Sequence, residues 1–221
     1  MCEDLQMAQR DSADKTLADY PRPSVAVDTA VLTVRDGRLC VVLVEDGRRL
    51  PGTFLHEGET LADAVDRALL TKAGLRGEHP TQLHVFDDPG RDERGWVLSV
   101  AHLVAVPALR LEELPAGVVL TRVTGVGTLD FDHNQILDLA VERLRADYRY
   151  RPDPGALLDE PFTLRELQHL HEGVAGQRLM RDTFRRRMEP QLVATGDYHR
   201  GSVGMPARTF VRPRDEIRAE R

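Results

Sequence analysis

A proline-rich stretch divides this chain into two parts with different sequence patterns. Residues 149–161 contain three prolines and a glycine, which interrupt helices and strands alike. Before this stretch, apolar runs of strand length mix with amphipathic helical runs, whereas short helices follow it. A chain of 221 residues can form two small domains. The sequence therefore predicts one domain over residues 21–150 and a second over residues 151–221.

The first part predicts a mixed α/β domain. Its Val-rich apolar runs are typical of strands, and Asp36 and Gly37 between the first two are typical of a hairpin turn. Two amphipathic stretches predict helices, one ended by Gly74 and the other begun by Asp132 as its N-cap. We expect strands over 24–35, 39–44, 82–86 and 97–106, and helices over 60–73 and 133–147. Strands with helices spread among them favour an α/β or α+β fold.

The second part predicts a helix-turn-helix followed by a two-stranded wing. Thr163 and Glu166 form a T-x-x-E capping box, which opens a first helix. Gly173 and Gly176 flank a turn, and a second helix spans about 179–189. The segments LVAT and RTFV then enclose a turn-rich segment, as in a hairpin. This order of elements is typical of a DNA-binding winged helix.

A cluster of arginines marks the second helix. The whole chain has a net charge of −6, but residues 151–221 hold 13 arginines and no lysine against 11 acids, and local clusters decide where a protein meets DNA. Phe184 and Met188, with Met180 one turn earlier, are expected to face the core. The alternative for the arginines is a solvated helix face, and Arg187 could form a salt bridge. The predicted DNA contacts are Arg178, Arg181, Thr183, Arg185, Arg186, Arg187 and Arg208.

Residues 51–75, PGTFLHEGETLADAVDRALLTKAGL, resemble the Nudix signature G-x5-E-x7-R-E-U-x-E-E-x-G-U, in which U is an aliphatic residue. When the first glutamate of the signature is placed on Glu59, its arginine falls on Arg67. Its closing Gly-aliphatic pair then falls on Gly74 and Leu75. The resemblance implies a Nudix-like α/β/α sandwich in which this segment forms a loop, a helix and a loop.

The resemblance stops at the metal ligands. The three helix glutamates of the signature fall on Ala68, Thr71 and Lys72, and its first glycine falls on Thr53, next to Gly52. In Nudix hydrolases such carboxylates hold Mg²⁺ or Mn²⁺ against a pyrophosphate. Alanine offers no ligand, threonine offers a weak one, and lysine places a positive charge where the ion would be. We therefore expect no metal, no cofactor and no hydrolysis.

Three acidic residues remain near the start of this helix. Glu59, Asp63 and Asp66 are spaced i, i+4 and i+7. Acids in a first helical turn commonly complement the helix dipole and face water. The alternative is a rebuilt metal site, and with it a divergent Nudix hydrolase that acts on a nucleoside diphosphate derivative.

Over about residues 50–213 the chain resembles the Nudix-related transcription regulators of the NrtR family. Six segments carry the likeness in matching order and spacing: LPGTFLHEGETL, FDDPGRDERGWVLSVAHLV, FDHNQILDLAVERLR, FTLRELQHLHEGVAGQ, MRDTFRRRMEPQLV and MPARTFV. The resemblance implies a Nudix-like domain that senses a small molecule, typically ADP-ribose. It also implies a winged helix that binds a palindromic double-stranded DNA operator as a homodimer, often near NAD-related genes.

Five residues of the first part are candidates for effector binding. Phe54 and Phe86 could stack on an adenine, although core or rim packing is the commoner role of such rings. Arg91 and Arg94 could pair with a diphosphate, because the arginine fork suits phosphate oxygens. An ordinary surface loop is the alternative for these two arginines. Gly52 completes the expected lining.

The remaining composition excludes several protein classes. The two cysteines provide neither a disulfide framework nor a zinc spacing, and no apolar run has the length of a membrane span. Residues 1–20 lack the apolar core of a secretory signal, so we expect a disordered lead-in and a cytoplasmic protein. The sequence favours a ligand-responsive transcription regulator. The alternatives are the divergent hydrolase and an adaptor that binds partners without either activity.

Overall fold

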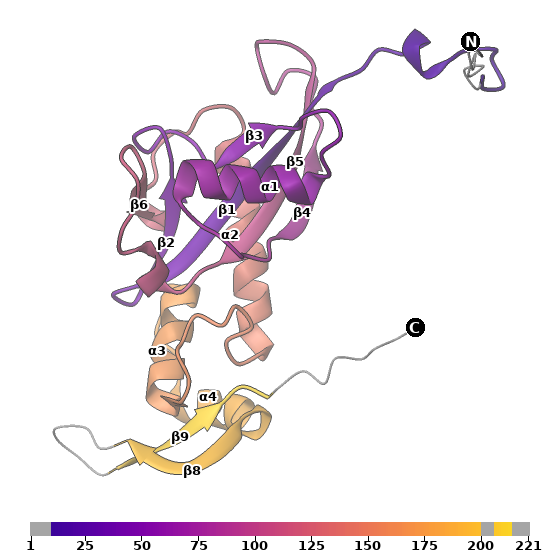
Figure 1. Cartoon of the computed structure of the whole chain (residues 1–221). Coiled ribbons are helices and arrows are strands. Elements are labelled where there is room, and N and C mark those ends of the chain that lie inside the picture. Colours follow the sequence, from indigo (N-terminus) through magenta and orange to yellow (C-terminus); the bar gives the residue numbers. More distant parts are fainter. Residues whose placement is uncertain (1–9, 200–205, 214–221) are drawn as a thin grey trace, which may run out of the picture.

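The computed structural model describes residues 10–199 and 206–213, and it places a sheet domain before a smaller C-terminal domain (Figure 1). In the sheet domain, β4, β5, β1, β2 and β6 are neighbours in that order, and β3 pairs with β1. β1 runs parallel to β5, and the other pairs are antiparallel. The strands are β1 Ser24–Arg35, β2 Arg38–Leu43, β3 Gly52–Phe54, β4 Thr81–Phe86, β5 Val97–Ala105 and β6 Val119–Arg122. The four expected strands are present, and β3 and β6 are additional.

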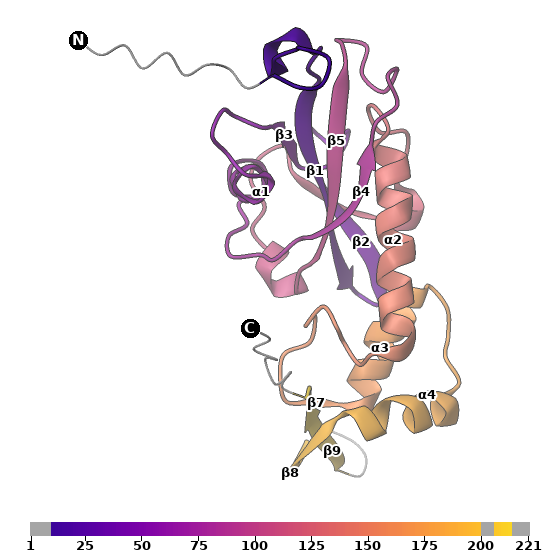
Figure 2. The same cartoon turned by 90° about the vertical axis from the view of Figure 1, so that its right-hand side faces the viewer.

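β1 is the centre of the sheet domain because it is buried on both faces. Val31 packs in the cluster beneath α1 (Leu61–Ala68), and Leu32 packs in the cluster beneath α2 (His133–Tyr150). A strand covered on both faces needs apolar residues at consecutive positions, which explains why its sequence alternates only in part. Figure 2 shows α1 and α2 on opposite sides of the sheet. These layers confirm the expected α/β/α sandwich.

The helix of the Nudix-like segment has two parts. α1 begins after Thr60, whose hydroxyl accepts a hydrogen bond from the backbone N–H of Asp63, while the Asp63 carboxylate accepts one from the backbone N–H of Thr60. The chain then continues as a π-helical turn, Leu69–Ala73. Gly74 ends it with a φ of 71°, a left-handed conformation that glycine adopts without strain. The predicted helix and its Gly74 end are confirmed, and the π-helical turn was not foreseen.

α2 is longer than the sequence predicted. It has 18 residues and ends at Tyr150, so it is about 27 Å long and reaches the C-terminal domain (Figure 2). Asp132 is at the expected N-cap position, but its side chain makes no capping hydrogen bond. The Arg91 guanidinium holds that carboxylate in two hydrogen bonds instead.

The C-terminal domain combines a helix-turn-helix with a three-stranded sheet. α3 (Leu164–Ala175) begins at the expected capping box of Thr163 and Glu166. The sheet order is β7, β9, β8, and both pairs are antiparallel. The remaining elements are α4 Arg181–Met188, β7 Phe162–Thr163, β8 Val193–His199 and β9 Ala207–Val211. This arrangement confirms the predicted winged helix and adds β7 to the two strands of the wing.

The core of the C-terminal domain differs from the prediction at one residue, Met180. Phe184 and Met188 of α4 pack against Phe162 and Phe210, as expected. Met180 does not join them, since 80% of its surface is exposed. The backbone at Met180 is extended, with a ψ of 117°, so this residue lies outside the helix and off its core face.

A buried carboxylate fixes the proline-rich connection between the domains. The Asp153 side chain accepts hydrogen bonds from the Tyr148 hydroxyl (2.7 Å), the Leu157 backbone N–H (2.8 Å) and the Arg212 guanidinium (2.6 Å). These partners belong to α2, the connection itself and the residues after β9. A Cβ added to Gly173 of α3 would lie 2.6 Å from Val34 of β1. The two domains are therefore closely packed against each other.

The N-terminal lead-in is described only in part. Residues 1–9 lie outside the described residues. Residues 10–20 contain a short 3-10 helix, and Leu17 at its start is largely exposed.

The 3-10 helices are Leu17–Asp19, Ala108–Leu111, Val123–Gly125 and Glu189–Gln191. Among the helices that the structure describes, none is both long and apolar enough to cross a membrane.

Candidate functional site

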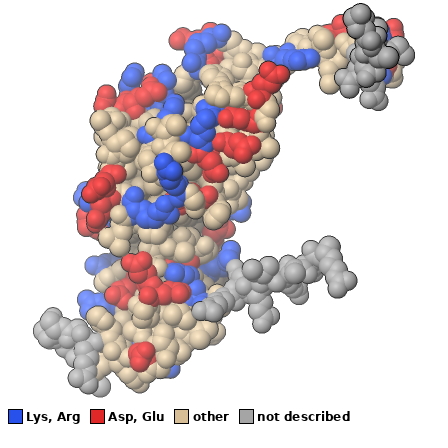
Figure 3. Space-filling view, viewed as in Figure 1, with Lys and Arg blue, Asp and Glu red and all other residues tan. Residues whose placement is uncertain are grey.

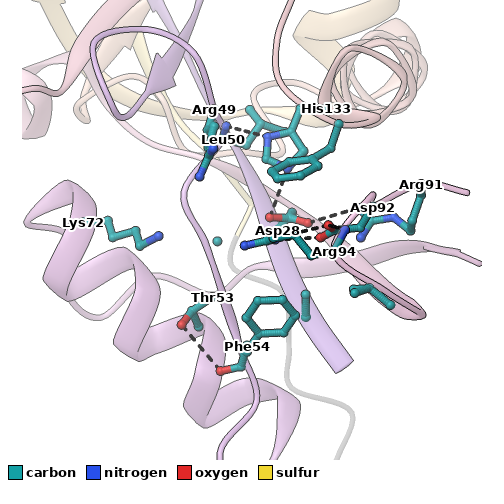
Figure 4. Close-up of a pocket in the computed structure, with 14 residues that line it drawn as sticks. Asp28, Arg49, Leu50, Thr53, Phe54, Lys72, Arg91, Asp92, Arg94 and His133 are labelled. Atoms are coloured by element: carbon teal, nitrogen blue, oxygen red, sulfur yellow. Dashed lines mark hydrogen bonds and ion pairs between the residues drawn. The ribbon is translucent and has the colours of Figure 1, made fainter. Parts of the chain in front are cut away.

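A cavity of about 240 Å³ opens beside β1 and β3 (Figure 4). Its walls come from segments far apart in the sequence: Asp28 of β1, Thr53 of β3, Lys72 of the π-helical turn, Arg94 before β5 and Phe131 before α2. The cavity also contains four of the five residues that the sequence proposed for effector binding, namely Gly52, Phe54, Arg91 and Arg94.

Asp28 forms a hydrogen-bonded carboxylate centre in this cavity. The Ser99 hydroxyl donates to Asp28 Oδ2 at 2.5 Å, and His133 Nε2 lies 3.4 Å from Oδ1. The backbone N–H of Leu50 donates to His133 Nδ1 at 3.0 Å, so the ring proton is on Nε2 and faces Asp28. Burial alone raises the pKa of Asp28, but hydrogen bonds from His133 and Ser99 and the charge of Arg91 bring it below its ordinary value. Asp28 is therefore an ionised group.

Sequence reasoning missed Asp28, although a signal was present. An acid within the run VAVDTAV is unusual, because a charged residue in a buried strand needs partners that a local pattern does not show. Gly52 lies opposite Asp28 in the β1–β3 register. A Cβ added to Gly52 would lie 1.9 Å from Asp28 Oδ1 and 2.7 Å from the Val27 carbonyl oxygen. Gly52 is thus required by the close approach of the two strands.

Arg91 is held by carboxylates on the wall of the cavity. Its side chain is 4% exposed, and its Nη2 lies 2.6 Å from Asp132 Oδ1 and 3.7 Å from Asp28 Oδ2. Both acids are also nearly buried. The structure therefore gives Arg91 a charge-balancing position inside the protein, whereas the sequence proposed that it pairs with a diphosphate.

Arg94 lies at a more open part of the cavity. It forms two hydrogen bonds to Asp92, at 2.9 and 2.6 Å, and these lower the pKa of Asp92 to about 2. Its guanidinium carbon lies 5.5 Å from the Phe54 ring and 5.1 Å from the Phe131 ring. The Arg49 guanidinium lies 5.0 Å from the Phe131 ring as well. Phe131 and Arg49 were not foreseen, and the FDHNQ segment around Phe131 was the available signal.

Phe86 is separated from the other proposed effector residues. It does not line the 240 Å³ cavity. It lines a neighbouring hollow of about 610 Å³, together with His84, which packs edge-on against its ring. The two hollows share Arg91 and Phe131. Phe86 is the last residue of the bulged β4 strand, so its direction depends on a register shift that the sequence does not reveal.

The Nudix-like segment retains its structural contacts. Arg67 Nε and Nη2 donate to the two carboxylate oxygens of Glu59, both at 2.7 Å, and this pair lowers the pKa of Glu59 to about 2. Arg67 also donates to the Thr53 hydroxyl at 3.0 Å and to the Phe54 carbonyl at 2.9 Å. The arginine of the signature therefore fastens the loop before α1 to that helix.

The positions of the metal ligands do not fit a divalent cation. Ala68 is fully buried, and the Thr71 hydroxyl donates to the Arg67 carbonyl at 2.7 Å. Lys72 brings a positive charge to the cavity. Glu59 and Asp63, two of the three acids of the alternative site, are engaged by Arg67 and Thr60. Within residues 10–199 and 206–213 there is no group of three or more His, Cys, Asp or Glu side chains arranged to hold a metal.

The arginine-rich face belongs to α4. Arg181, Arg185 and Arg186 are exposed on it. Arg185 Nε lies 2.7 Å from Glu189 Oε2, and Arg208 of β9 lies 3.9 Å from Glu189 Oε1. Figure 3 shows positive and negative side chains interspersed over the sheet domain. In the same orientation α4 lies behind the β8–β9 hairpin (Figure 1).

Three other residues proposed for DNA contact have different surroundings. Arg187 faces α2, because its guanidinium carbon lies 5.5 Å from the Tyr150 ring and its Nη1 donates to the Arg149 carbonyl at 3.2 Å. The structure therefore separates Arg187 from the arginine face. Arg178 is 90% exposed in the turn before α4 and lies 3.4 Å from Glu172. Thr183 is exposed and lines a hollow between α4 and α2.

Comparison with known proteins gives matches to both domains. The family model described as the NrtR DNA-binding winged helix domain matches residues 154–211. The ADPR responsive transcriptional repressor NtrR of Acinetobacter baylyi is 30% identical over 209 residues, which cover 87% of this chain and 83% of that protein. An ADP-ribose pyrophosphatase of Methanocaldococcus jannaschii is 30% identical over 128 residues, or 53% of this chain and 73% of that enzyme.

Two solved structures from Shewanella oneidensis match this chain, one over both domains and one over the sheet domain alone. NrtR complexed with a 27mer DNA has a TM-score of 0.73 and 31% identity, and the match covers 86% of this chain and 93% of that chain. The NUDIX domain of NrtR complexed with ADP ribose has a TM-score of 0.52 and 26% identity, and the match covers 60% of this chain and 95% of that chain. The sheet domain is therefore Nudix-like, and a winged-helix domain follows it.

Proposed function

This chain belongs to the NrtR family, and on that premise we propose that it is an ADP-ribose-responsive repressor of transcription. The winged-helix domain binds DNA, and the Nudix-like domain binds the effector in the cavity at Asp28 and Arg94. The proposed domains are residues 21–150 and 151–221. The relatives named for repression, DNA binding and ADP-ribose binding support this assignment.

The path of α2 is the observation that carries the proposal. His133 at its start lines the cavity and faces Asp28. At its end, the Tyr150 carbonyl accepts a hydrogen bond from Gln191 at 2.9 Å, and the Tyr150 ring lies against Arg187 of α4. One continuous helix therefore contacts both the effector cavity and the DNA-facing helix. A ligand that shifts α2 changes the position of α4, which is the coupling a ligand-responsive repressor needs.

The cavity has groups suited to a nucleoside diphosphate. Phe54 and Phe131 offer aromatic faces for an adenine, and Arg94 and Arg49 offer cationic groups for the diphosphate. Gly52 has no side chain, which leaves room for the Asp28 carboxylate beside these groups. Arg91 contributes by fixing Asp28 and Asp132, which makes it a positioning residue in this proposal.

We propose further that the protein does not hydrolyse its effector. Ala68, Thr71 and Lys72 replace the carboxylates that a Nudix hydrolase uses for its metal. The binding energy of ADP-ribose is then available for a conformational change without loss of the ligand to hydrolysis.

The proposed DNA surface is the α4 face with Arg181, Arg185 and Arg186, joined by Arg208 of the wing. A homodimer would present two such faces to a palindromic operator. Light scattering at micromolar protein concentration should give the mass of a dimer, and a monomer mass would contradict this part of the proposal.

A mobility-shift assay tests the whole function. The probe is DNA from upstream of the protein's own coding sequence, with and without ADP-ribose, beside an assay for phosphate release. We expect a retarded protein–DNA complex that dissociates when ADP-ribose is added. We also expect no hydrolysis of ADP-ribose. A protein–DNA complex that is unchanged by ADP-ribose, or steady hydrolysis of ADP-ribose, would overturn the proposal.

A further inference from the structure

We propose that the Lys72 ammonium takes the place of the divalent cation and supplies the available positive charge of a metal-independent diphosphate subsite. This inference rests on the proposed function, because it concerns how the same cavity holds ADP-ribose. It identifies the feature that lets a Nudix-like domain bind a diphosphate after losing its metal ligands.

The position of Lys72 is the first support. It stands where the Nudix signature has the last of its helix glutamates, and it lines the cavity. Figure 4 shows its side chain extending from the helix toward the middle of the cavity, across from Asp28 and Arg91. The π-helical turn Leu69–Ala73 carries it there, and such turns are frequent at functional sites.

The charges around Lys72 are the second support. The acids that line the cavity, Asp28 and Asp92, are satisfied by other groups: Ser99 and His133 for the first and Arg94 for the second. Arg91 is bound to Asp132, and Arg49 lies 2.7 Å from Asp130. Among the residues that the structure describes, Lys72 has no carboxylate within ion-pair distance. Its charge therefore remains available to a ligand.

The chemistry of the ammonium group suits this place. It has three donors and a compact positive charge, and lysine binds phosphates as a point charge in other nucleotide sites. It can balance part of the charge of a diphosphate, as a metal ion does. It cannot activate a water molecule as a metal does. A lysine at this position therefore allows binding and provides no hydrolysis.

The chain itself supplies an internal control for a test. Lys72 is one of only two lysines, and the other, Lys15, lies before β1. The full-length protein is treated with an amine-acylating reagent in EDTA, and the two lysine-containing peptides are followed by mass spectrometry. ADP-ribose should slow the labelling of Lys72 and leave Lys15 unchanged. Inorganic pyrophosphate, used as a second probe, should also protect Lys72. Equal labelling of Lys72 with and without both probes would overturn the inference.

Calorimetry on variants tests the energetic role. The parent protein should bind ADP-ribose equally well in EDTA and in Mg²⁺. Lys72→Met should weaken that binding at least about tenfold, because one charge-assisted contact is lost, and Lys72→Glu should weaken it further. Lys15→Met should bind as the parent does. Binding of adenosine, which has no diphosphate, should be the same in Lys72→Met and in the parent.

The outcomes separate this inference from the proposed function. A parent protein that needs Mg²⁺ to bind ADP-ribose, or a folded Lys72→Met variant that binds it as tightly as the parent, overturns the subsite. A parent protein that does not bind ADP-ribose at all overturns the effector assignment. In that case protection of Lys72 by pyrophosphate still supports the diphosphate subsite. Circular dichroism melting of each variant shows whether a lost affinity comes from a lost fold.

Discussion

The cavity of the Nudix-like domain and the α4 face of the winged helix both depend on arginines, but the surroundings of those arginines differ. Arg91 in the cavity is 4% exposed and lies between two buried acids. Arg181 and Arg186 on α4 face solvent. A buried arginine fixes the shape of a site, because removing it leaves uncompensated charge. An exposed one contributes little to folding and remains available for phosphates.

Arg187 shows that exposed arginines of one helix can also have different neighbours, since both Arg186 and Arg187 are exposed. It belongs to the α4 cluster in sequence but lies against Tyr150 of α2. Its neighbour Arg186 contacts its own helix instead, where its Nε donates to the Asp182 carbonyl at 3.3 Å. The density of arginines in a sequence therefore indicates a surface, and the packing of the helix decides which of them belong to it.

The largest expected effect comes from the cavity side of this comparison. Arg91→Ala should lower the free energy of unfolding by about 3–5 kcal/mol, since it leaves Asp132 and Asp28 without their common cation. Urea unfolding followed by circular dichroism measures it. Arg181→Ala, the matched change on α4, should stay within about 0.5 kcal/mol of the parent. Equal losses in the two variants would remove the distinction between the regions.

The junction between the two regions should respond to pH. Burial lowers the pKa of His171 to about 4, against the opposing charge of Asp153. An unfolded histidine takes up its proton below about pH 6.5, whereas the folded one does so only near 4, so stability should fall by roughly 3 kcal/mol as the pH drops through that window. Unfolding at several pH values should show a weaker dependence in His171→Gln. The exposed neighbour variant His169→Gln should keep the slope of the parent.

Substitutions on the α4 face should change the affinity for DNA and leave the free energy of unfolding nearly unchanged. Arg185→Ala should weaken operator binding at least about tenfold at about 0.15 M salt, with unchanged effector affinity. If two to four arginines per subunit meet phosphates, the logarithm of the binding constant of a dimer should fall with the logarithm of salt at a slope of about −4 to −7. Fluorescence anisotropy at several salt concentrations measures the operator affinity and its salt dependence.

Arg187→Ala is the matched control for that helix. Because Arg187 faces α2, its loss should leave operator affinity close to that of the parent. An Arg187 variant that binds DNA as poorly as Arg185→Ala would contradict the separation of the two faces.

The smallest expected effect is catalytic. Metal-dependent turnover of ADP-ribose should stay far below about 1 per second, a modest enzymatic rate. Glutamate at positions 68, 71 and 72 together should restore little, since the groups around a metal site also have to support it. Turnover near that rate by the parent protein would contradict the proposed loss of hydrolysis.

Features that depend on neighbours in sequence were predictable. The capping box of Thr163 and Glu166, the Asp36-Gly37 turn and the end of a helix at Gly74 all appear as expected. The exposed face of α4 follows from Phe184 and Met188 being buried four residues apart. Each of these rests on contacts within a few residues, which the sequence contains directly.

The cavity depended on tertiary structure. Asp28 meets Gly52 through the β1–β3 register, Ser99 through β5, and His133 through the start of α2. Phe86 and Arg91 were proposed for the same site, yet Phe86 lies outside the cavity after a bulge in β4, and Arg91 lines the cavity but is bound to Asp132. Lys72 reached the cavity through a π-helical turn that no propensity indicated.

The sequence by itself determined that there are two domains, most of their helices and strands, the missing metal carboxylates and the arginine-rich second helix. Only the tertiary structure decided which charges are paired and which remain available. The physical reason is that helix and turn preferences act over a few residues, whereas the pairing of a charge depends on strand register and helix packing between distant segments. Lys72 and Arg91 line the same cavity. Arg91 is bound to Asp132, whereas Lys72 is available to a ligand.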